Sequence, residues 1–392
     1  MIVRQFLQWV RTAPAGLRAE ATGALARAYL YSDLSEDDRS VAEGAMIIML
    51  DDPSPLVRRA LAEALCGSAD APPAVIHGLA GDQPDIAALV LERSELFIDA
   101  DLVEIVATGH TVVQCAVARR QWLPRAVAAA LAEIGTPEAC LTLIENMSAD
   151  IALFSVDRIV ERHGHLAAIR EALLARDDVP APTRQALVAK LSEALADFVT
   201  ARAWLAPDHA QRITREACEK AAVTISATVP EEGQALIGHL RATGQLTAGL
   251  ILRAVLSGNV LLFEDALADL SGLPRSRIHG IIRSRSASGF RALYERAGLP
   301  ESAYPAFREV IGALRDMRNA YEPGSAGQLR RRMVERVLQG CARAELDEVE
   351  PLLMLLRRFA TEAAREEARH FCNDLVAEDF FAVDSHYDRI AA

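Results

Sequence analysis

The sequence contains few aromatic residues and no sustained strand-like pattern. Aromatic side chains make up only 5% of its 392 residues, although 51% are hydrophobic, and alanine and leucine dominate. This composition favours helices, because strands are enriched in aromatic and β-branched residues. No alternation of apolar and polar residues extends between glycine or proline turns, which argues against half-buried strands. We therefore predict an all-α protein.

Positive charge is also in short supply. The chain has 42 lysine and arginine residues against 54 aspartate and glutamate residues, which gives a formal net charge of −12. General polyanion-binding domains are usually basic, so this composition argues against one. Lys190 and Lys220 are the only lysines. Arginine is thus the default cation of the chain, and its abundance alone is weak support for phosphate binding.

Long hydrophobic runs are missing as well. The longest apolar segment, 250–263, is interrupted by Arg253 and Asn259 and is too short to cross a bilayer. The apolar N-terminus contains Arg4 and Arg11, and no small-residue cleavage site follows it. That pattern predicts an amphipathic helix rather than a signal peptide. We therefore expect a soluble, cytoplasmic protein that does not bind a membrane.

Motifs for catalysis, cofactors and metals are absent from the sequence. It has no Walker loop, Gly-x-Gly-x-x-Gly, Gly-x-Ser-x-Gly, His-Glu-x-x-His or Cys-x-x-Cys. His163 and His165 are two residues apart, as are His370 and Cys372, a spacing that points side chains to different sides of a helix. We expect no metal, no cofactor, no catalytic residue and no enzyme activity. The six cysteines are expected to be reduced, buried thiols: Cys66, Cys115, Cys140, Cys218, Cys341 and Cys372.

What the sequence does contain is a helix-forming unit at 51–65. Asp52 or Ser54 can cap the free N–H groups of a helix, and Pro55 suits its first turn, where no donor is missed. An apolar face at helical spacing follows, formed by Leu56, Ala60, Leu61, Ala64 and Leu65. Looser copies of this unit come after it, which suggests a stack of helix pairs.

Glycines mark the repeats. Gly81, Gly109, Gly135 and Gly164 lie near predicted helix ends, where a left-handed backbone costs glycine least. A unit of two short helices cannot bury its apolar face alone, so neighbouring units must stack. We predict a curved, right-handed solenoid over about 34–165. The tryptophans are expected to pack in the core or between repeats: Trp9, Trp122 and Trp204.

Loops rich in turn-forming residues divide the chain. The segment 177–182 contains two prolines and two aspartates, and 322–327 contains a proline and two glycines. Thr183 and Asp208 are suitable caps for the longer helices that follow the first loop. Three regions result: HEAT-like helical repeats at 1–176, a middle helical region at 183–321, and a C-terminal amphipathic helix pair with an acidic tail at 326–392.

Part of the sequence resembles known helical repeats. The pattern Asp-x-x-x-x-Val-Arg-x-x-Leu-Ala-x-x-Leu at 52–65 resembles HEAT and leucine-rich-variant repeats. A closer resemblance is to the bacterial domain-of-unknown-function family 2336, over about 15–165 and extending toward 320. It rests on four stretches: Leu91–Leu96, Asp101–Leu102, Ala116–Arg120 and Leu143–Asn146. The resemblance implies a fold and no activity, because that family has no established chemistry.

The resemblance to HEAT-like repeats also implies a role for two charged residues. In such repeats an aspartate at the turn and an arginine in the following helix often pair between neighbours. Asp52 and Arg58 match these positions, whereas Ala87 and Val113 replace the arginine in later repeats. A continuous ladder of ion pairs is therefore not expected.

A further motif lies at 263–285. Its small, turn and apolar residues, Ala268, Gly272, Ile278 and Ile281, match the spacing of DNA-binding helix-turn-helix units. Any helical hairpin needs the same residues, however, and Gly280 would weaken a recognition helix. The exposed face of the second helix would carry donors for phosphates and base edges: Arg275, Arg277, His279, Arg283 and Arg285.

These observations favour a non-enzymatic scaffold or adaptor that binds a protein partner. A candidate rim at the ends of the second helices consists of Arg93, Glu95, Arg119, Arg120 and Gln121. The alternative is a transcription regulator that reads DNA with the 263–285 hairpin, although nucleic acid is the less favoured partner. A regulator needs the arginines of 275–296 free of acidic neighbours, whereas a scaffold has them paired or scattered. The C-terminal helices either cover the stack or form a homodimer.

Overall fold

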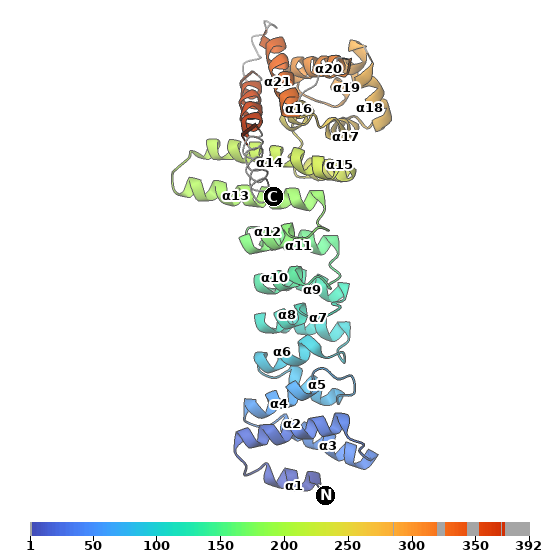
Figure 1. Ribbon diagram of the computed structural model, residues 1–392, viewed down its shortest axis with the longest axis vertical. Coiled ribbons are helices and arrows are strands. Elements are labelled where there is room, and N and C mark those ends of the chain that lie inside the picture. The colour runs from blue at the N-terminus through green and yellow to red at the C-terminus, as the bar shows by residue number, and fades with distance from the viewer. Residues whose placement is uncertain (1, 285, 320–325, 343–352, 370, 373–392) are drawn as a thin grey trace, which may run out of the picture. The chain divides into compact units, whose positions relative to one another are not determined.

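The computed structural model describes residues 2–284, 286–319, 326–342, 353–369 and 371–372. Within these ranges the secondary structure is helical and contains no strand, so the prediction of an all-α protein is confirmed. The chain divides into two compact units, Met1–Val179 (unit 1) and Pro180–Ala392 (unit 2), and the border lies in the proline-rich loop at 177–182 (Figure 1). None of the helices in the described ranges is long and apolar enough to cross a membrane.

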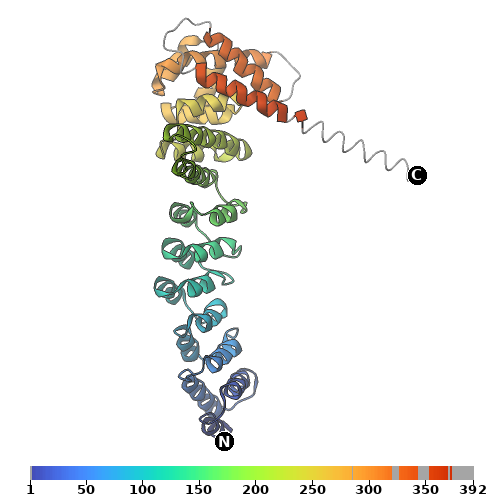
Figure 2. The ribbon, with the colours of Figure 1, turned by 90° about the vertical axis from the view of Figure 1, so that its left-hand side faces the viewer.

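The helices of unit 1 pack in two rows. The even-numbered helices from α2 to α12 contact one another in succession, and α7, α9 and α11 do the same in the other row. Figures 1 and 2 show the successive pairs of unit 1 following one another along the stack. The helices are α1 (Ile2–Trp9), α2 (Ala15–Tyr31), α3 (Glu36–Met49), α4 (Pro55–Leu65), α5 (Pro73–Ala80), α6 (Pro84–Arg93), α7 (Asp99–Thr108), α8 (Thr111–Ala118), α9 (Arg125–Ile134), α10 (Pro137–Glu145), α11 (Leu153–His163) and α12 (Ala167–Leu174).

Helix α4 shows how the sequence forms one of these elements. It begins at Pro55 after the N-cap residue Ser54, and neither predicted cap bonds a helix N–H group. Asp52 Oδ1 instead accepts a hydrogen bond from the Ser54 backbone N–H at 2.8 Å, just before the helix. The buried face differs from the predicted one, because Leu56 is 58% exposed. Leu61 and Leu65 are buried as predicted, whereas Val57 and Ala62 are buried in place of Leu56, Ala60 and Ala64. The buried stripe is thus rotated relative to the predicted one, and α4 packs against α2 and α6.

The four repeat glycines lie at helix ends, but none has the left-handed backbone that was predicted. Gly81, Gly109, Gly135 and Gly164 all have negative φ values, between −91° and −61°. At Gly109 the reason for glycine is close approach, since an added Cβ would lie 2.6 Å from the Ile105 carbonyl oxygen. At Gly135 it would collide with the equivalent carbonyl of the preceding turn. These glycines therefore let the chain leave a helix tightly.

Unit 2 is a helical assembly around one apolar core. Phe263, Tyr294 and Phe307 are fully buried at its centre, and their rings lie within 6.2 Å of one another in contacting pairs. A further helical segment covers 353–369. The other α-helices are α13 (Ala181–Ala201), α14 (Pro207–Thr228), α15 (Gly233–Ala242), α16 (Ala248–Leu256), α17 (Val260–Ser271), α18 (Arg275–Arg283), α19 (Ala287–Arg296), α20 (Tyr304–Asn319) and α21 (Ala326–Ala342).

Prolines rather than the predicted side-chain caps begin the two long helices. Helix α13 follows Pro180 and α14 begins at Pro207, and neither N-cap makes a side-chain hydrogen bond. Thr183 is buried inside α13, and Asp208 lies in the first turn of α14. The predicted C-terminal pair corresponds to α21, which packs on α20 and α16, and to the helix at 353–369. The acidic tail lies outside the described residues.

Candidate functional surfaces and cavity

Two ion pairs connect the first repeats of unit 1. Arg18 on α2 forms a two-bond contact with Asp52 at 2.8 and 2.9 Å, and Arg58 on α4 forms one with Asp82 at 2.6 and 3.0 Å. Arg58 also donates to the Asp52 backbone carbonyl at 2.5 Å. Burial alone would raise the pKa of Asp52, but hydrogen bonds from Arg18 and Ser54 and nearby positive charge hold that pKa below its ordinary value. Asp52 and Arg58, the two residues that the resemblance implies, therefore both form ion pairs. The side chain of Asp52 pairs with Arg18 and that of Arg58 pairs with Asp82.

Further along unit 1 the repeats are joined by side chains that donate to backbone carbonyls. Arg120, after α8, donates to Leu91 O and, at 2.7 Å, to Ser94 O at the end of α6. Asn146, after α10, donates to Ala118 O and Arg120 O at 2.8 Å each. The last carbonyls of a helix have no partner within it, so each of these bonds satisfies a group that would otherwise need water.

Two more arginines repeat this arrangement. Arg162 on α11 donates to Ala132 O and Gly135 O at 2.7 and 3.0 Å, and Arg176 donates to Ile144 O at 3.0 Å. In both cases the acceptors lie at the end of a helix in the preceding repeat. The position of each loop is thus fixed by the helix pair before it.

The predicted rim residues divide into two groups. Arg93, Glu95, Arg119 and Gln121 are exposed, as expected for a surface rim, and Arg119 lies 3.8 Å from Glu92. The expectation was wrong for Arg120, which is half-buried because its guanidinium is directed inward onto the α6 carbonyls. Burial lowers the pKa of Arg120. Its guanidinium connects this loop to the end of α6 and is not part of the exposed rim.

The loops that carry this rim also expose large apolar side chains. We call the loops after α6, α8 and α10, together with the first residues of α11, the loop edge; it covers 94–98, 119–124 and 146–154. The loops touch, since Arg120 donates to Ser94 O, the Trp122 N–H donates to Ser148 Oγ at 3.4 Å and the Asp150 N–H to Leu123 O at 3.3 Å. Exposed fractions are 65% for Ile98, 77% for Trp122, 72% for Met147, 58% for Leu153 and 64% for Phe154.

Sequence reasoning missed this apolar edge, because the tryptophans were expected in the core. Trp9, Trp122 and Trp204 are instead 41%, 77% and 63% exposed. Trp122 also has a φ of 61°, a conformation that bulky side chains rarely adopt. The sequence signal for this exposure was the polar run Arg119–Gln121 that directly precedes Trp122.

In unit 2, α17 and α18 form the predicted hairpin. Gly272 has a φ of 67° and ends α17, and Ile278 on α18 is fully buried, as the motif requires. Two of the predicted donors have acidic neighbours: Arg275 lies 3.2 Å from Asp265 Oδ1, and His279 Nδ1 lies 2.6 Å from Glu264 Oε1.

The remaining cations of the hairpin region differ in their surroundings. Arg291 pairs with Glu295 and Glu301, and Arg296 donates to the Ser271 carbonyl at 2.7 Å. Within the part of the chain that the structure describes, Arg277 and Arg283 are exposed and make no ion pair. Arg285 lies outside the described residues.

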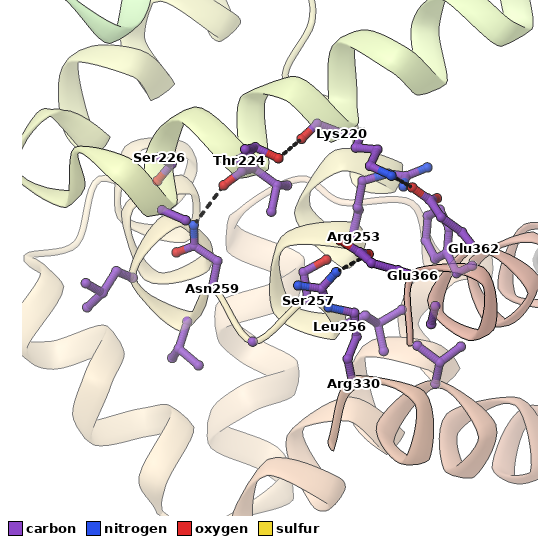
Figure 3. Close-up of a pocket in the computed structure, with 18 of the residues that line it drawn as sticks. Lys220, Thr224, Ser226, Arg253, Leu256, Ser257, Asn259, Arg330, Glu362 and Glu366 are labelled. Carbon is purple, nitrogen blue, oxygen red and sulfur yellow. Dashed lines mark hydrogen bonds and ion pairs between the residues drawn. The ribbon is translucent and has the colours of Figure 1, made fainter. Parts of the chain in front are cut away.

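Unit 2 also contains a cavity of about 500 Å³, which opens between α14, α16, the start of α17, α21 and the helix at 353–369. Figure 3 shows Lys220, Arg253 and Arg330 gathered with Glu362 and Glu366 on one side of it, and Ser226 and Asn259 on the other. Its wall has an apolar part, which includes Val223, Leu256, Val260, Val334 and Phe359.

The charged side of the cavity is tightly connected. Glu362 accepts from Arg253 at 2.5 Å and pairs with Lys220 at 3.0 Å, while Glu366 pairs with Arg330 at 2.6 Å. The Arg253 guanidinium also lies 4.3 Å from the centre of the Phe359 ring. Burial opposes ionisation of Glu362, but hydrogen bonds and charge from Arg253 and Lys220 hold its pKa below the ordinary value.

The thiols and possible metal ligands do not form a reactive site among the described residues. The six cysteines are free, and four of them are buried. Burial raises the pKa of Cys140 and of Cys341 to about 11, so neither is a thiolate at neutral pH. No group of three or more His, Cys, Asp or Glu side chains is placed to hold a metal ion in the described ranges.

Comparison with known proteins gives one match. The family model described as "Uncharacterised protein conserved in bacteria (DUF2336)" matches residues 86–347, which is more than half of the chain. The match begins at α6 and continues past α21, so it starts later and ends later than the resemblance seen in the sequence. No curated protein and no solved structure matches the chain. The chain therefore belongs to the bacterial family DUF2336.

Proposed function

We propose that the protein is a non-enzymatic scaffold or adaptor whose loop edge in unit 1 binds another protein. The observation that carries this proposal is the set of large apolar side chains on three touching loops, of which Trp122 and Met147 are 77% and 72% exposed. Single exposed apolar residues are normal on protein surfaces, but several on one continuous edge are typical of an interaction site. Tryptophan and methionine are also enriched in protein interfaces.

The loop edge has the layout of an interface. Its apolar residues are bordered by the exposed polar side chains of Arg93, Glu95, Arg119 and Gln121. Such a polar border around apolar anchors is the usual arrangement of protein-binding surfaces. Neighbouring packed helices are about 8–10 Å apart, so successive loops present their side chains at a regular spacing that suits a helix or an extended segment.

The backbone of Trp122 adds independent support. A φ of 61° is costly for a bulky residue, and such conformations cluster at functional sites, where the surroundings hold them. Here the Trp122 N–H donates to Ser148 Oγ, and Asn146 accepts from Ser148 and holds the Arg120 carbonyl. The conformation directs the indole outward from the stack.

The alternative of a DNA-binding regulator has less support. The regulator requires unpaired arginines on one face of the hairpin, but Arg275 faces Glu264 and Asp265, and Arg291 and Arg296 are engaged elsewhere. Arg277 and Arg283 alone are few phosphate contacts for useful affinity. A fluorescence-polarisation titration with mixed genomic DNA fragments over a salt series tests this. Salt-dependent binding that disappears in Arg277→Ala/Arg283→Ala would favour the regulator.

The scaffold proposal is tested by quantitative capture from bacterial lysate with three versions of the full chain. They are the wild type, Trp122→Ser/Met147→Ser, and the control Tyr31→Ser, which removes a 79% exposed aromatic residue from α2 outside the loop edge. We expect at least one protein to be retained by the wild type and the control and lost with the double variant. Its purified form should then bind the double variant about 30-fold more weakly or worse, as interface anchors do. An identical set of captured proteins for all three versions would refute the proposal.

A further inference from the structure

The lining of the cavity in unit 2 has more cationic than anionic side chains. Three cations line it, Lys220, Arg253 and Arg330, but only two carboxylates do, Glu362 and Glu366. Glu362 pairs with both Lys220 and Arg253. A third acid, Glu219, lies outside the lining, with Oε2 3.7 Å from Arg253 Nε, and its other oxygen accepts from Thr247 at 2.8 Å. Burial raises the pKa of Glu219, and its side chain lines a different cavity, between α13, α14 and the start of α16.

Two guanidinium donors of the cavity also have no acceptor. Among the described residues, the Nε atoms of Arg253 and Arg330 are buried and make no hydrogen bond. Arg253 itself is only 7% exposed. A buried donor without an acceptor is rare in folded proteins and costs stability, so each such group requires an explanation. An oxyanion bound beside these two guanidinium groups would add negative charge to a lining that has more cations than carboxylates.

The rest of the wall defines the remainder of the ligand. The volume of about 500 Å³ lies in the range of small-molecule sites, which are largely apolar with a few placed polar groups. Val223, Leu256 and Phe359 provide the apolar part, and Ser226 and Asn259 lie opposite the cations (Figure 3). We propose that this cavity binds a small molecule that joins an apolar body to one oxyanion group, either a phosphate or a carboxylate.

The test uses isothermal titration calorimetry of the full chain with four probes. They are n-hexyl phosphate, hexanoate, 1-hexanol and inorganic phosphate. The proposal expects one of the first two to bind at least about tenfold more tightly than 1-hexanol, since hydrogen bonds to a charged group are the stronger ones. The two oxyanion probes distinguish a phosphate ligand from a carboxylate ligand. Equal affinity for 1-hexanol, or no binding of either oxyanion at 10 mM, would overturn the proposal.

Neighbouring ion pairs on α21 provide matched variants. Arg330 pairs with Glu366 and lines the cavity, whereas Arg331 pairs with Glu335 and Glu367 and does not line it. Arg330→Gln should weaken oxyanion binding about tenfold or more. Glu366→Gln should strengthen it severalfold, because it removes a competing carboxylate. Arg331→Gln and Glu367→Gln should leave it unchanged.

The opposite signs keep the proposal testable if one variant fails to fold. If Arg330→Gln is unfolded by circular dichroism, the comparison of Glu366→Gln with Glu367→Gln decides the outcome. Tighter binding of hexyl phosphate or hexanoate in Glu366→Gln alone supports an oxyanion beside Arg330. Unchanged or weaker binding in Glu366→Gln means that the oxyanion does not contact this guanidinium and overturns the proposal.

Discussion

Replacing Asn146 by alanine should destabilise unit 1 and loosen the loop edge. Its Nδ2 donates to the Ala118 and Arg120 carbonyls at 2.8 Å each, and its Oδ1 accepts from the Ser148 N–H at 3.1 Å and from Ser148 Oγ at 2.7 Å. Net contributions of about 0.5–1.5 kcal/mol per hydrogen bond, with water replacing part of the loss at the exposed Ser148, give a loss of about 2–4 kcal/mol. The same change frees the loop in which Trp122 lies.

Trp122 provides the assay. In a background with Trp9→Phe and Trp204→Phe, its fluorescence reports guanidinium unfolding of this part of unit 1 alone. Hydrogen exchange at the amides of 119–124 should speed up in the same variant, because local opening costs less free energy. Local readouts are needed, since repeat units are stabilised mainly by their nearest neighbours and need not unfold together.

Two variants separate the donor effect from a general effect of substitution. Asn146→Asp keeps an acceptor but turns an oxygen toward two carbonyl oxygens, so it should be at least as unstable as Asn146→Ala. Thr142→Ala removes a bond made only within its own helix, to the Glu138 carbonyl, and should cost less than about 0.5 kcal/mol. A loss below about 1 kcal/mol for Asn146→Ala, or an Asn146→Asp protein more stable than Asn146→Ala, would refute the reasoning.

Three further predictions concern acid, thiols and glycine. The fold lowers the pKa of Asp52, so the ionised Asp52 side chain stabilises unit 1 above the ordinary pKa of about 3.9, and this stabilisation is lost as the pH falls through the lowered pKa. In Asp52→Asn, the stability of unit 1 measured from pH 5 to pH 2 should therefore fall less steeply than in the wild type. Cys372, which is exposed, should react with Ellman's reagent at neutral pH far faster than Cys140, whose pKa is about 11; equal rates would contradict the burial. Gly135→Ala should lower the free energy of unfolding in urea by about 1–3 kcal/mol. Gly44→Ala, within α3 and with open space around it, should raise that free energy by about 0.5–1 kcal/mol. A change of the same sign in both variants would contradict the close approach at Gly135.

The sequence was informative where structure depends on near neighbours. Helix periodicity, Pro55 and the turn glycine Gly272 predicted helices and a hairpin that the structure contains, because caps and apolar spacing act within a few residues. The error at Leu56 has the same origin, since two overlapping stripes fit the spacing and only contact with the neighbouring helices chooses between them.

The sequence was uninformative where partners lie far apart in the chain. Arg18 meets Asp52 across 34 positions, and Arg253 meets Glu362 across 109. No local spacing marks such pairs, so the cavity of unit 2 was not predicted at all. For the arginines of α18 the sequence predicted too much rather than too little. Their number suggested an anion-binding face, but in the structure Glu264 and Asp265 lie beside Arg275.

Arg120 shows why the bonds between repeats bear on function. The sequence predicted Arg120 in the binding rim. Its guanidinium instead donates hydrogen bonds to two carbonyls at the end of α6, and these bonds fix the loop that contains Trp122. A surface held in this way loses little conformational entropy when a partner binds, which favours affinity without further contacts. Replacing Arg120 should therefore weaken the binding that we propose, whether or not the partner contacts Arg120. Substitutions that test the proposed interface are therefore best made at Trp122 and Met147, whose side chains are mostly exposed.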